Sequence, residues 1–285
     1  MSSRNTLAPE PERDPDAVFR NFMRHNLTRA ADHFALTIAG EPIFGWRLRS
    51  ISAGAANRAG PRWLRVVSQE SHWARGIAWT GTVDANDIAG IAKPSVLDVY
   101  EWSEQNWRDQ RAEVMTIMPG EPCSPTDVLR REQALQGRWW SDLRRSLDSL
   151  ATTSTQRVNA DADRVSGRIR ERFGAAVDTT VTQWSTCHGD LHWSNLLHDP
   201  FGLLDWELWG RAPAGTDAAT LLCYSLLTPA TANKIRSSFA DLLDTSTGRT
   251  AQLYVIARLL RRIDGGDHPD LAEPLARHAC TLLAT

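Results

Sequence analysis

The sequence predicts an α+β protein in which a smaller, strand-rich part precedes a larger helical part. Between residues 44 and 118, apolar and polar side chains alternate in short runs, as is typical of half-buried strands. After Pro119-Gly120, apolar residues recur with the period of amphipathic helices. We therefore expect a boundary near Gly120, with one domain over residues 16–119 and another over residues 120–285. Residues 1–15, which are rich in Pro, Glu and Ser, predict a disordered tail.

Composition excludes several classes of function. The chain has 285 residues, a net charge of −2 and a pI near 6.4, so it lacks the basic footprint of proteins that bind nucleic acid or anionic membranes. Its four cysteines, at positions 123, 187, 223 and 280, are widely spaced, which indicates reduced thiols. No apolar run is long enough to span a bilayer. We expect a cytoplasmic protein whose partner is a small molecule.

The N-terminal part mixes both periods. Its first apolar stripe, which includes Phe19, Phe22 and Met23, has helical spacing. The later runs are shorter and alternate, so they predict strands. The expected elements are a helix over 16–38, strands over 44–51 and 62–67 joined by a small-residue loop at 52–57, a short helix at 84–90, and strands over 96–100 and 112–118.

The C-terminal part is predicted to be mostly helical. Ser124-Pro125 is a helix start signal, because Ser caps a helix and Pro fits its first turn. Asp217 lies where an acid favours the first turn of another helix. Residues 209–213 are expected to be irregular. The predicted helices are 124–135, 139–150, 164–172, 217–227, 231–243, 250–263 and 269–283.

One stretch of twenty residues, His188 to Glu207, carries the chemistry: HGDLHWSNLLHDPFGLLDWE. Leu196-Leu197 and Leu203-Leu204 predict two short strands, and the residues between them have turn chemistry. Folding this hairpin brings Asn195 and Asp205 together. Two oxygen ligands on one small platform suit Mg²⁺, which usually takes one or two carboxylates plus substrate phosphates.

Asp190 lies on the loop just before this hairpin, where it can face whatever the metal holds. An Asp that accepts a hydroxyl proton, with an Asn and a second Asp on the metal, is the arrangement that phosphoryl transfer requires. Two other interpretations stay open. The segment could be a polar turn, or His188 and His192 could hold a transition metal for a hydrolase. Cys187, directly before the motif, is interpreted as a buried small side chain.

These residues, HGDxxxxN followed by DWE, resemble the aminoglycoside phosphotransferase and choline kinase-like family. The resemblance implies a two-lobed, protein-kinase-like fold with a small N-lobe and a larger helical C-lobe. It also implies an enzyme that moves the γ-phosphate of ATP or GTP to a hydroxyl of a natural product or antibiotic, with Mg²⁺. By resemblance, Asp190 is the catalytic base and His188 braces its loop. Asn195 and Asp205 are the metal ligands, and Asp217 is a further brace.

The resemblance extends to nucleotide binding, with two departures. It implies that a loop at Gly54 to Asn57 covers the phosphates and that the backbone of Thr116 and Met118 meets the nucleobase. The strand position expected to carry a phosphate-binding lysine carries Arg65. The helix expected at 84–90 has no glutamate to pair with that cation, and Asp84, Asp87 and Glu70 are the possible substitutes. These departures leave open a catalytically silent, nucleotide-binding module.

The acceptor is less well specified. Candidate contacts are Trp193, Glu207, Asp264 and Asp267. Residues 215–285 contain seven acidic and seven basic side chains, so there is no acid-rich wall of the kind that a polycationic aminoglycoside would favour. We therefore expect a hydroxylated acceptor with little positive charge.

Overall fold

The computed structural model describes residues 14–104 and 107–284. The predicted disordered tail therefore lies outside the described residues, except for Asp14 and Pro15, which begin the first helix. The chain divides into two compact units, one formed by Met1–Arg75 with Val96–Ile117 and the other by Gly76–Ser95 with Met118–Thr285. The predicted boundary near Gly120 is close to the last of these divisions. The segment 76–95, predicted in the first domain, groups with the second.

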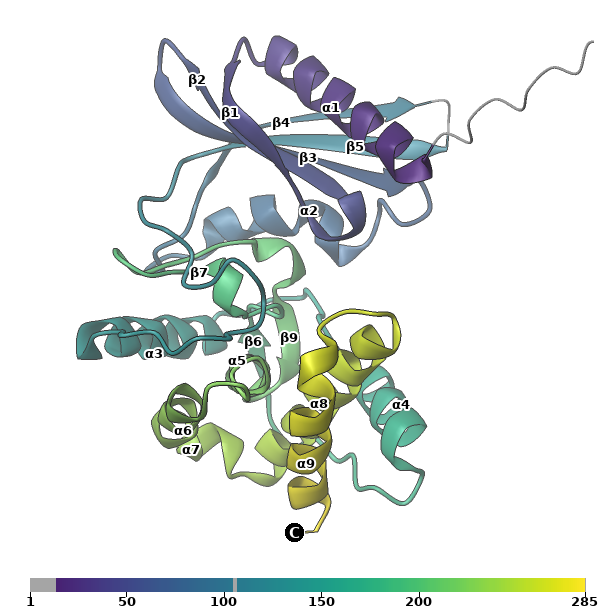
Figure 1. The fold of residues 1–285 in the computed structure, drawn as a ribbon, viewed down its shortest axis with the longest axis vertical. Helices are drawn as coiled ribbons and strands as arrows, with labels where there is room; N and C mark the ends of the chain where they lie inside the picture. Colours follow the sequence, from purple (N-terminus) through teal and green to yellow (C-terminus); the bar gives the residue numbers. More distant parts are fainter. Residues whose placement is uncertain (1–13, 105–106, 285) are drawn as a thin grey trace, which may run out of the picture. The chain divides into compact units, whose positions relative to one another are not determined.

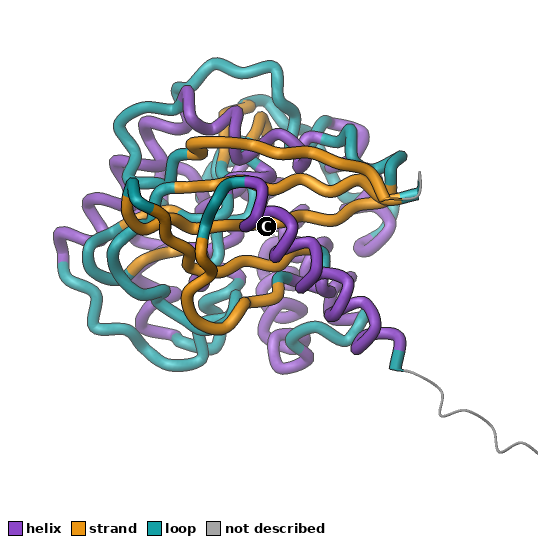
Figure 2. The backbone as a smooth tube through the Cα atoms, turned by 90° about the horizontal axis from the view of Figure 1, so that it is seen from above, coloured by secondary structure: helices purple, strands orange, loops and turns teal. Residues whose placement is uncertain are grey.

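The first unit is an antiparallel sheet with one helix on it. The helix α1 (Pro15–His33) runs across one face of the sheet (Figures 1 and 2). It buries Met23 and Leu27 in a core with Ile51, Leu64 and Val66. The helix was predicted over 16–38; it ends earlier, at His33. The strands lie in the order β1 (Thr37–Phe44), β2 (Ser50–Asn57), β3 (Gly60–Glu70), β5 (Arg108–Met115) and β4 (Val96–Glu104).

The loop predicted at 52–57 is wrong, because these small residues form strand β2. Gly54 pairs with Ala39 on one side and Trp63 on the other. The turn lies earlier, at residues 45–49, and interrupts the strand predicted over 44–51. Asn57 instead shapes the next turn, where its side chain accepts a hydrogen bond of 2.9 Å from the Ala59 N–H.

The second unit is mostly helical. Its helix α8 (Ser246–Asp264) runs through the core and is buried along most of its length. Two short β-ribbons carry the motif segment. The remaining elements are α2 (Ile77–Asp84), η2 (Ala85–Asp87), α3 (Gly137–Ala151), α4 (Ala162–Phe173), β6 (Trp184–Cys187), η3 (Trp193–Asn195), β7 (Leu196–Leu197), β8 (Gly202–Leu203), η4 (Trp206–Leu208), β9 (Gly210–Pro213), α5 (Thr216–Cys223), α6 (Pro229–Ser238), α7 (Ala240–Leu243), η5 (Pro269–Leu271) and α9 (Ala272–Leu283).

Three predicted elements of this unit are wrong. Residues 124–135 are not helical, because their backbone bonds to distant partners: the Leu129 N–H donates to Tyr224 O at 3.0 Å. The Ser124 hydroxyl, expected to cap a helix, donates instead to Val128 O. The short helix expected at 84–90 is displaced: α2 ends at Asp84, and only the 3-10 turn η2 (Ala85–Asp87) lies within the predicted range. The segment 209–213, expected to be irregular, forms β9 and pairs with β6.

Within residues 14–104 and 107–284, no helix combines the length and the apolar character needed to cross a bilayer.

Candidate active site

The motif segment folds as a loop, residues 188–195, followed by the predicted hairpin. We call this loop the motif loop. It begins where β6 ends, and the hairpin of β7 and β8 follows it, with Leu196 opposite Leu203. The Leu204 N–H donates to Asn195 O at 2.9 Å, which places Asn195 beside the residue that precedes Asp205. Asp205 has a left-handed backbone with φ of 58°, and η4 begins directly after it.

Asp217 braces the motif loop, as predicted. Its two carboxylate oxygens accept hydrogen bonds from the backbone N–H groups of His188, at 2.7 Å, and Gly189, at 3.0 Å. Asp217 is 7% exposed, and this burial raises the pKa of its carboxyl group. The charge of Arg258 and the two N–H donors act in the opposite direction. The start of the loop is therefore anchored to α5 by charge-assisted hydrogen bonds.

His188 ties the same loop to the hairpin. Its Nε2 lies 2.9 Å from Leu204 O, and because a carbonyl only accepts, Nε2 is the donor. The ring also meets Trp206 edge-on, with centroids 4.9 Å apart. Burial lowers the pKa of His188, so the ring is neutral near pH 7. His188 thus fixes the backbone one residue before Asp205.

Asp190 faces His192 across the motif loop. The Asp190 Oδ2 lies 3.4 Å from His192 Nε2. Burial alone would raise the pKa of Asp190, but the charges of His192 and Arg258 and the hydrogen bond with His192 hold it well below its usual range. Burial alone would lower the pKa of His192, and the carboxylates of Asp190, Asp127 and Asp205 raise it instead. Asp190 is therefore ionised at neutral pH.

A cluster of charged side chains continues from His192 toward the end of α8. We call it the Asp127 cluster; it contains Asp127, Arg262, Asp267 and His268. The carboxylate of Asp127 lies 3.8 Å from His192 Nε2, 3.0 Å from Arg262 Nη2 and 3.4 Å from His268 Nε2. Arg262 also binds Asp267 at 3.0 Å. Each acid of the cluster therefore lies beside a cation.

Asn195 and Asp205 form a donor set that suits a hard divalent cation. The Asn195 Nδ2 donates to Asp190 O at 3.0 Å, so its nitrogen is used within the loop and its oxygen is the atom that can ligate a cation. Asp205 carries a carboxylate one residue after Leu204, whose N–H donates to Asn195 O. Among the described residues, no three His, Cys, Asp or Glu side chains gather as a metal site. One carboxylate and one amide fit Mg²⁺, which keeps water and phosphate ligands, better than they fit zinc.

In the first unit, Arg65 has an acidic partner on the neighbouring strand. Its Nη1 lies 3.6 Å from Glu113 Oε2, and the Arg111 Nε lies 3.1 Å from Glu113 Oε1. Arg65 of β3 and Glu113 of β5 face each other in the sheet register. The carboxylate partner of Arg65 is therefore Glu113, which belongs to the same sheet. Thr116 and Met118 follow directly after β5.

The sequence model of the phosphotransferase enzyme family, APH, matches residues 74–253. The chain belongs to this family. The sequence predicted a kinase that phosphorylates a hydroxyl group of a small molecule, and membership of this family confirms that prediction. None of the curated proteins compared with the chain matches it.

Solved structures of family members share the fold. Aminoglycoside phosphotransferase APH(4)-Ia superposes with a TM-score of 0.62 at 14% identity, over 90% of this chain and 98% of that one. Amicoumacin kinase hAmiN gives 0.54 at 14% identity, over 92% and 93% of the two chains. Spectinomycin phosphotransferase APH(9)-Ia gives 0.55 at 12% identity, over 88% of each. The predicted kinase-like α+β fold is confirmed.

The four residues predicted to contact the acceptor lie in different surroundings in the structure. Trp193 is fully buried and stacks on Trp139 with centroids 6.0 Å apart, and its role as an acceptor contact stays a prediction. Glu207 is also buried. Asp264 pairs with Arg172 of α4 at 2.9 Å. Only Asp267 joins the Asp127 cluster beside the motif loop.

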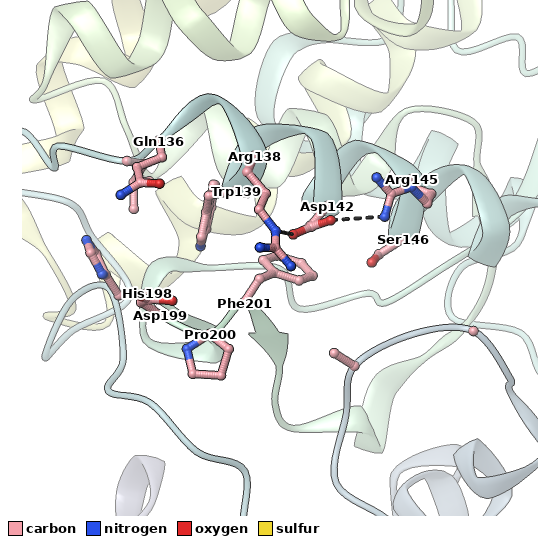
Figure 3. A pocket seen from close by; sticks show the side chains of 13 residues that line it. Gln136, Arg138, Trp139, Asp142, Arg145, Ser146, His198, Asp199, Pro200 and Phe201 are labelled. Atoms are coloured by element: carbon pink, nitrogen blue, oxygen red, sulfur yellow. Dashed lines mark hydrogen bonds and ion pairs between the residues drawn. The ribbon is translucent and has the colours of Figure 1, made fainter.

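A cavity of about 540 Å³ lies at the other end of the hairpin (Figure 3). Trp139, Asp142 and Ser146 of α3 line it, together with the hairpin turn Asp199–Phe201. Asp142 pairs there with Arg138 and Arg145. None of the predicted site residues lines this cavity, so it is separate from the motif loop.

Several residues that contact the motif segment were not predicted as site residues. His192 was considered only as a metal ligand, and Asp127 lay within a predicted helix. Arg157 and Asn159 carried no sequence signal, because each comes from a distant part of the chain to bind Glu207 O or Leu208 O.

Proposed function

We propose that this phosphotransferase moves the γ-phosphate of ATP or GTP to a hydroxyl group of a small natural product or antibiotic, with Mg²⁺ bound by Asn195 and Asp205. The observation that carries the proposal is the geometry of the motif loop, which is fixed at both ends and places the Asp190 carboxylate 3.4 Å from His192 Nε2. Asp217 holds the start of the loop, and the hairpin holds its end.

In this proposal Asp190 orients the acceptor hydroxyl and takes up its proton. Phosphoryl transfer passes through a loose transition state, so catalysis depends mainly on positioning and on charge stabilisation. An ionised carboxylate can accept the hydrogen bond of the hydroxyl from the start. His192 holds the carboxylate of Asp190 from the side of the Asp127 cluster.

Bound Mg²⁺ would neutralise charge on the nucleotide phosphates. The chain's contribution is to fix the two ligand side chains. Asn195 is oriented by its donation to Asp190 O, and Asp205 by the turn that places it after Leu204.

For the nucleotide, we propose that Arg65 binds phosphate through its planar guanidinium and that the backbone of Thr116 and Met118 meets the nucleobase. Glu113 orients Arg65. The roles given to Gly54 and Asn57 rested on a loop that is instead a strand. We therefore assign the covering role to the turn at 45–49 between β1 and β2.

The Asp127 cluster favours an acceptor with little positive charge. Asp127 and Asp267 both bind Arg262, and Asp270 binds Arg130 at 2.8 Å. An acceptor with several amines would need carboxylates that lack such partners. Solved structures with this fold include complexes with nucleotide and antibiotic: ADP with hygromycin B, and ADP with spectinomycin. Antibiotics that present hydroxyl groups are therefore the first acceptors to test.

Calorimetric titration of ATP, and separately of GTP, with and without Mg²⁺ tests the first half of the proposal. We expect metal-dependent binding that the Asp205→Ala variant loses. The second half is tested by phosphate transfer from the bound nucleotide to hygromycin B, spectinomycin, amicoumacin and kanamycin. Binding of neither nucleotide would overturn the proposal, and preferred transfer to the most highly charged aminoglycoside would overturn the acceptor class.

A further inference from the structure

The segment after Asp205 is held by side chains from the loop between α3 and α4. This segment, η4 with Trp209, is too short to satisfy its own carbonyl groups. Arg157 Nη2 donates to Glu207 O at 3.2 Å, and Arg157 Nε donates to Trp209 O at 3.1 Å. Asn159 Nδ2 donates to Leu208 O at 2.9 Å. Three consecutive carbonyls are therefore bound by two side chains of one loop.

The remaining donors of Arg157 go to helix α2. Its Nη1 donates to Thr80 Oγ1 at 3.2 Å and to the carboxylate of Asp84, and its Nη2 also donates to Ile77 O. A guanidinium has five N–H groups, and all five of Arg157 are used. The guanidinium group of Arg157 lies over the ring of Trp209, with its Cζ 4.9 Å from the ring centroid. Arg157 thus joins α2 to the segment that follows Asp205.

Helix α2 approaches this segment too closely for a side chain at the contact. A Cβ at Gly81 would lie 2.1 Å from Glu207 O, so only glycine fits there without movement. The Trp209 Nε1 donates to Gly81 O at 2.8 Å. Asp84, one of the three acids considered as a partner of Arg65, is bound to Arg157.

We propose that Arg157 is a positioning residue for the metal ligand Asp205, and that α2 serves as its anchor. This inference rests on the proposed function. Asp205 has a left-handed backbone, which a residue other than glycine keeps only when its surroundings hold it. Hydrogen bonds to Leu204 fix the chain before Asp205, and Arg157 fixes the chain after it. Loosening the second attachment frees the carboxylate to turn away from the cation.

Arg157→Lys is the test variant, because it keeps the charge and the stem but loses the planar fork. The matched control is Arg144→Lys. Arg144 also uses several donors, to Asp148, Asp241 and Ser238 O, far from the motif segment. Both substitutions remove a multiply bonded guanidinium at a partly exposed site, so a comparable loss of thermal stability is expected from both.

The first readout is Mn²⁺ binding in the presence of nucleotide, measured by electron paramagnetic resonance. The second is the Mg²⁺ concentration that gives half-maximal turnover. Residues that orient metal ligands typically change metal affinity by roughly 10–100-fold. We expect Arg157→Lys to weaken Mn²⁺ binding and to raise the half-maximal Mg²⁺ concentration at least tenfold, with the acceptor KM unchanged. Arg144→Lys should match the wild type in both.

A second variant, Trp209→Phe, keeps a ring over Arg157 and removes only the bond to Gly81 O. We expect a smaller shift in the same direction. Wild-type metal affinity in both Arg157→Lys and Trp209→Phe would overturn the positioning role alone. Absence of metal-dependent nucleotide binding in the wild type would overturn the proposed function, and this inference with it.

Discussion

The carboxylate of Asp217 accepts a 2.7 Å hydrogen bond from the backbone N–H of His188, 29 residues earlier in the chain. The same carboxylate accepts from Gly189, whose left-handed backbone turns the chain toward Asp190. A side chain on α5 thereby fixes the first turn of the motif loop. The contact explains how Asp190 is presented without a regular element of its own.

Asp217→Asn is expected to lower both stability and turnover. An asparagine has one acceptor oxygen, so one buried N–H loses its partner, which costs about 1–3 kcal/mol. Thermal unfolding and kcat are the measurements. Asp163→Asn is the control, because Asp163 is an exposed acid in the first turn of α4 and shares only the helix-dipole effect. Equal effects of the two substitutions would mean that Asp217 acts through the helix and not through the loop.

Asp190→Asn is expected to reduce kcat by about 10²–10⁴-fold, because the amide cannot accept the proton of the hydroxyl. The KM values for nucleotide and acceptor should change little, since the variant keeps the shape of the side chain. Steady-state kinetics with a coupled assay for nucleoside diphosphate give both constants. Turnover within tenfold of the wild type would remove Asp190 from the mechanism.

Arg65→Ala is expected to raise the nucleotide KM by about 10–100-fold, because hydrogen bonds to charged groups contribute about 1.5–3 kcal/mol. The acceptor KM should stay the same. Arg62→Ala is the control on the same strand, since residues three apart in a strand point to opposite faces. An unchanged nucleotide KM in Arg65→Ala, measured at saturating acceptor, would leave phosphate binding to other residues.

Acid should destabilise the protein through His278. Burial lowers the pKa of His278 to about 4, below the usual histidine value of 6.5, and the charge of Arg236 acts in the same direction. The unfolded chain therefore takes up the proton first as the pH falls from 6.5 to 4, and stability is lost over this range. Between pH 7 and pH 5 the loss is about 2 kcal/mol.

Urea unfolding of the wild type and of His278→Gln at pH 7 and pH 5 checks this prediction. Gln252 uses its Nε2 for Leu243 O and Gly248 O, so its oxygen accepts from His278 Nε2, which fixes the neutral tautomer. The variant should lose less stability than the wild type between the two pH values. The same pH dependence in both proteins would contradict the assignment to His278.

The sequence indicated the helical C-terminal part and the motif hairpin because both depend on local patterns. The apolar stripes of α3 and α8 have the period of a helix, and Asn195 and Asp205 are joined by one short turn. The prediction failed where a local helix signal competed with backbone hydrogen bonds to residues distant in the chain. Ser124-Pro125 has the chemistry of a helix start, yet residues 124–135 stay irregular: the Leu129 N–H donates to Tyr224 O, and Asp127 O accepts from the Trp193 N–H.

The residues of the motif segment predict a loop and a hairpin that carry an acid, an amide and a second acid, and the hairpin forms as predicted. The contacts that hold them are tertiary: Asp217 binds the start of the loop, and Arg157 binds the chain after Asp205. These contacts join residues that are far apart in the chain, and they form only when helices pack and exclude water from the groups between them. A hydrogen bond of this kind depends on where two elements meet, which the residues near either partner do not encode.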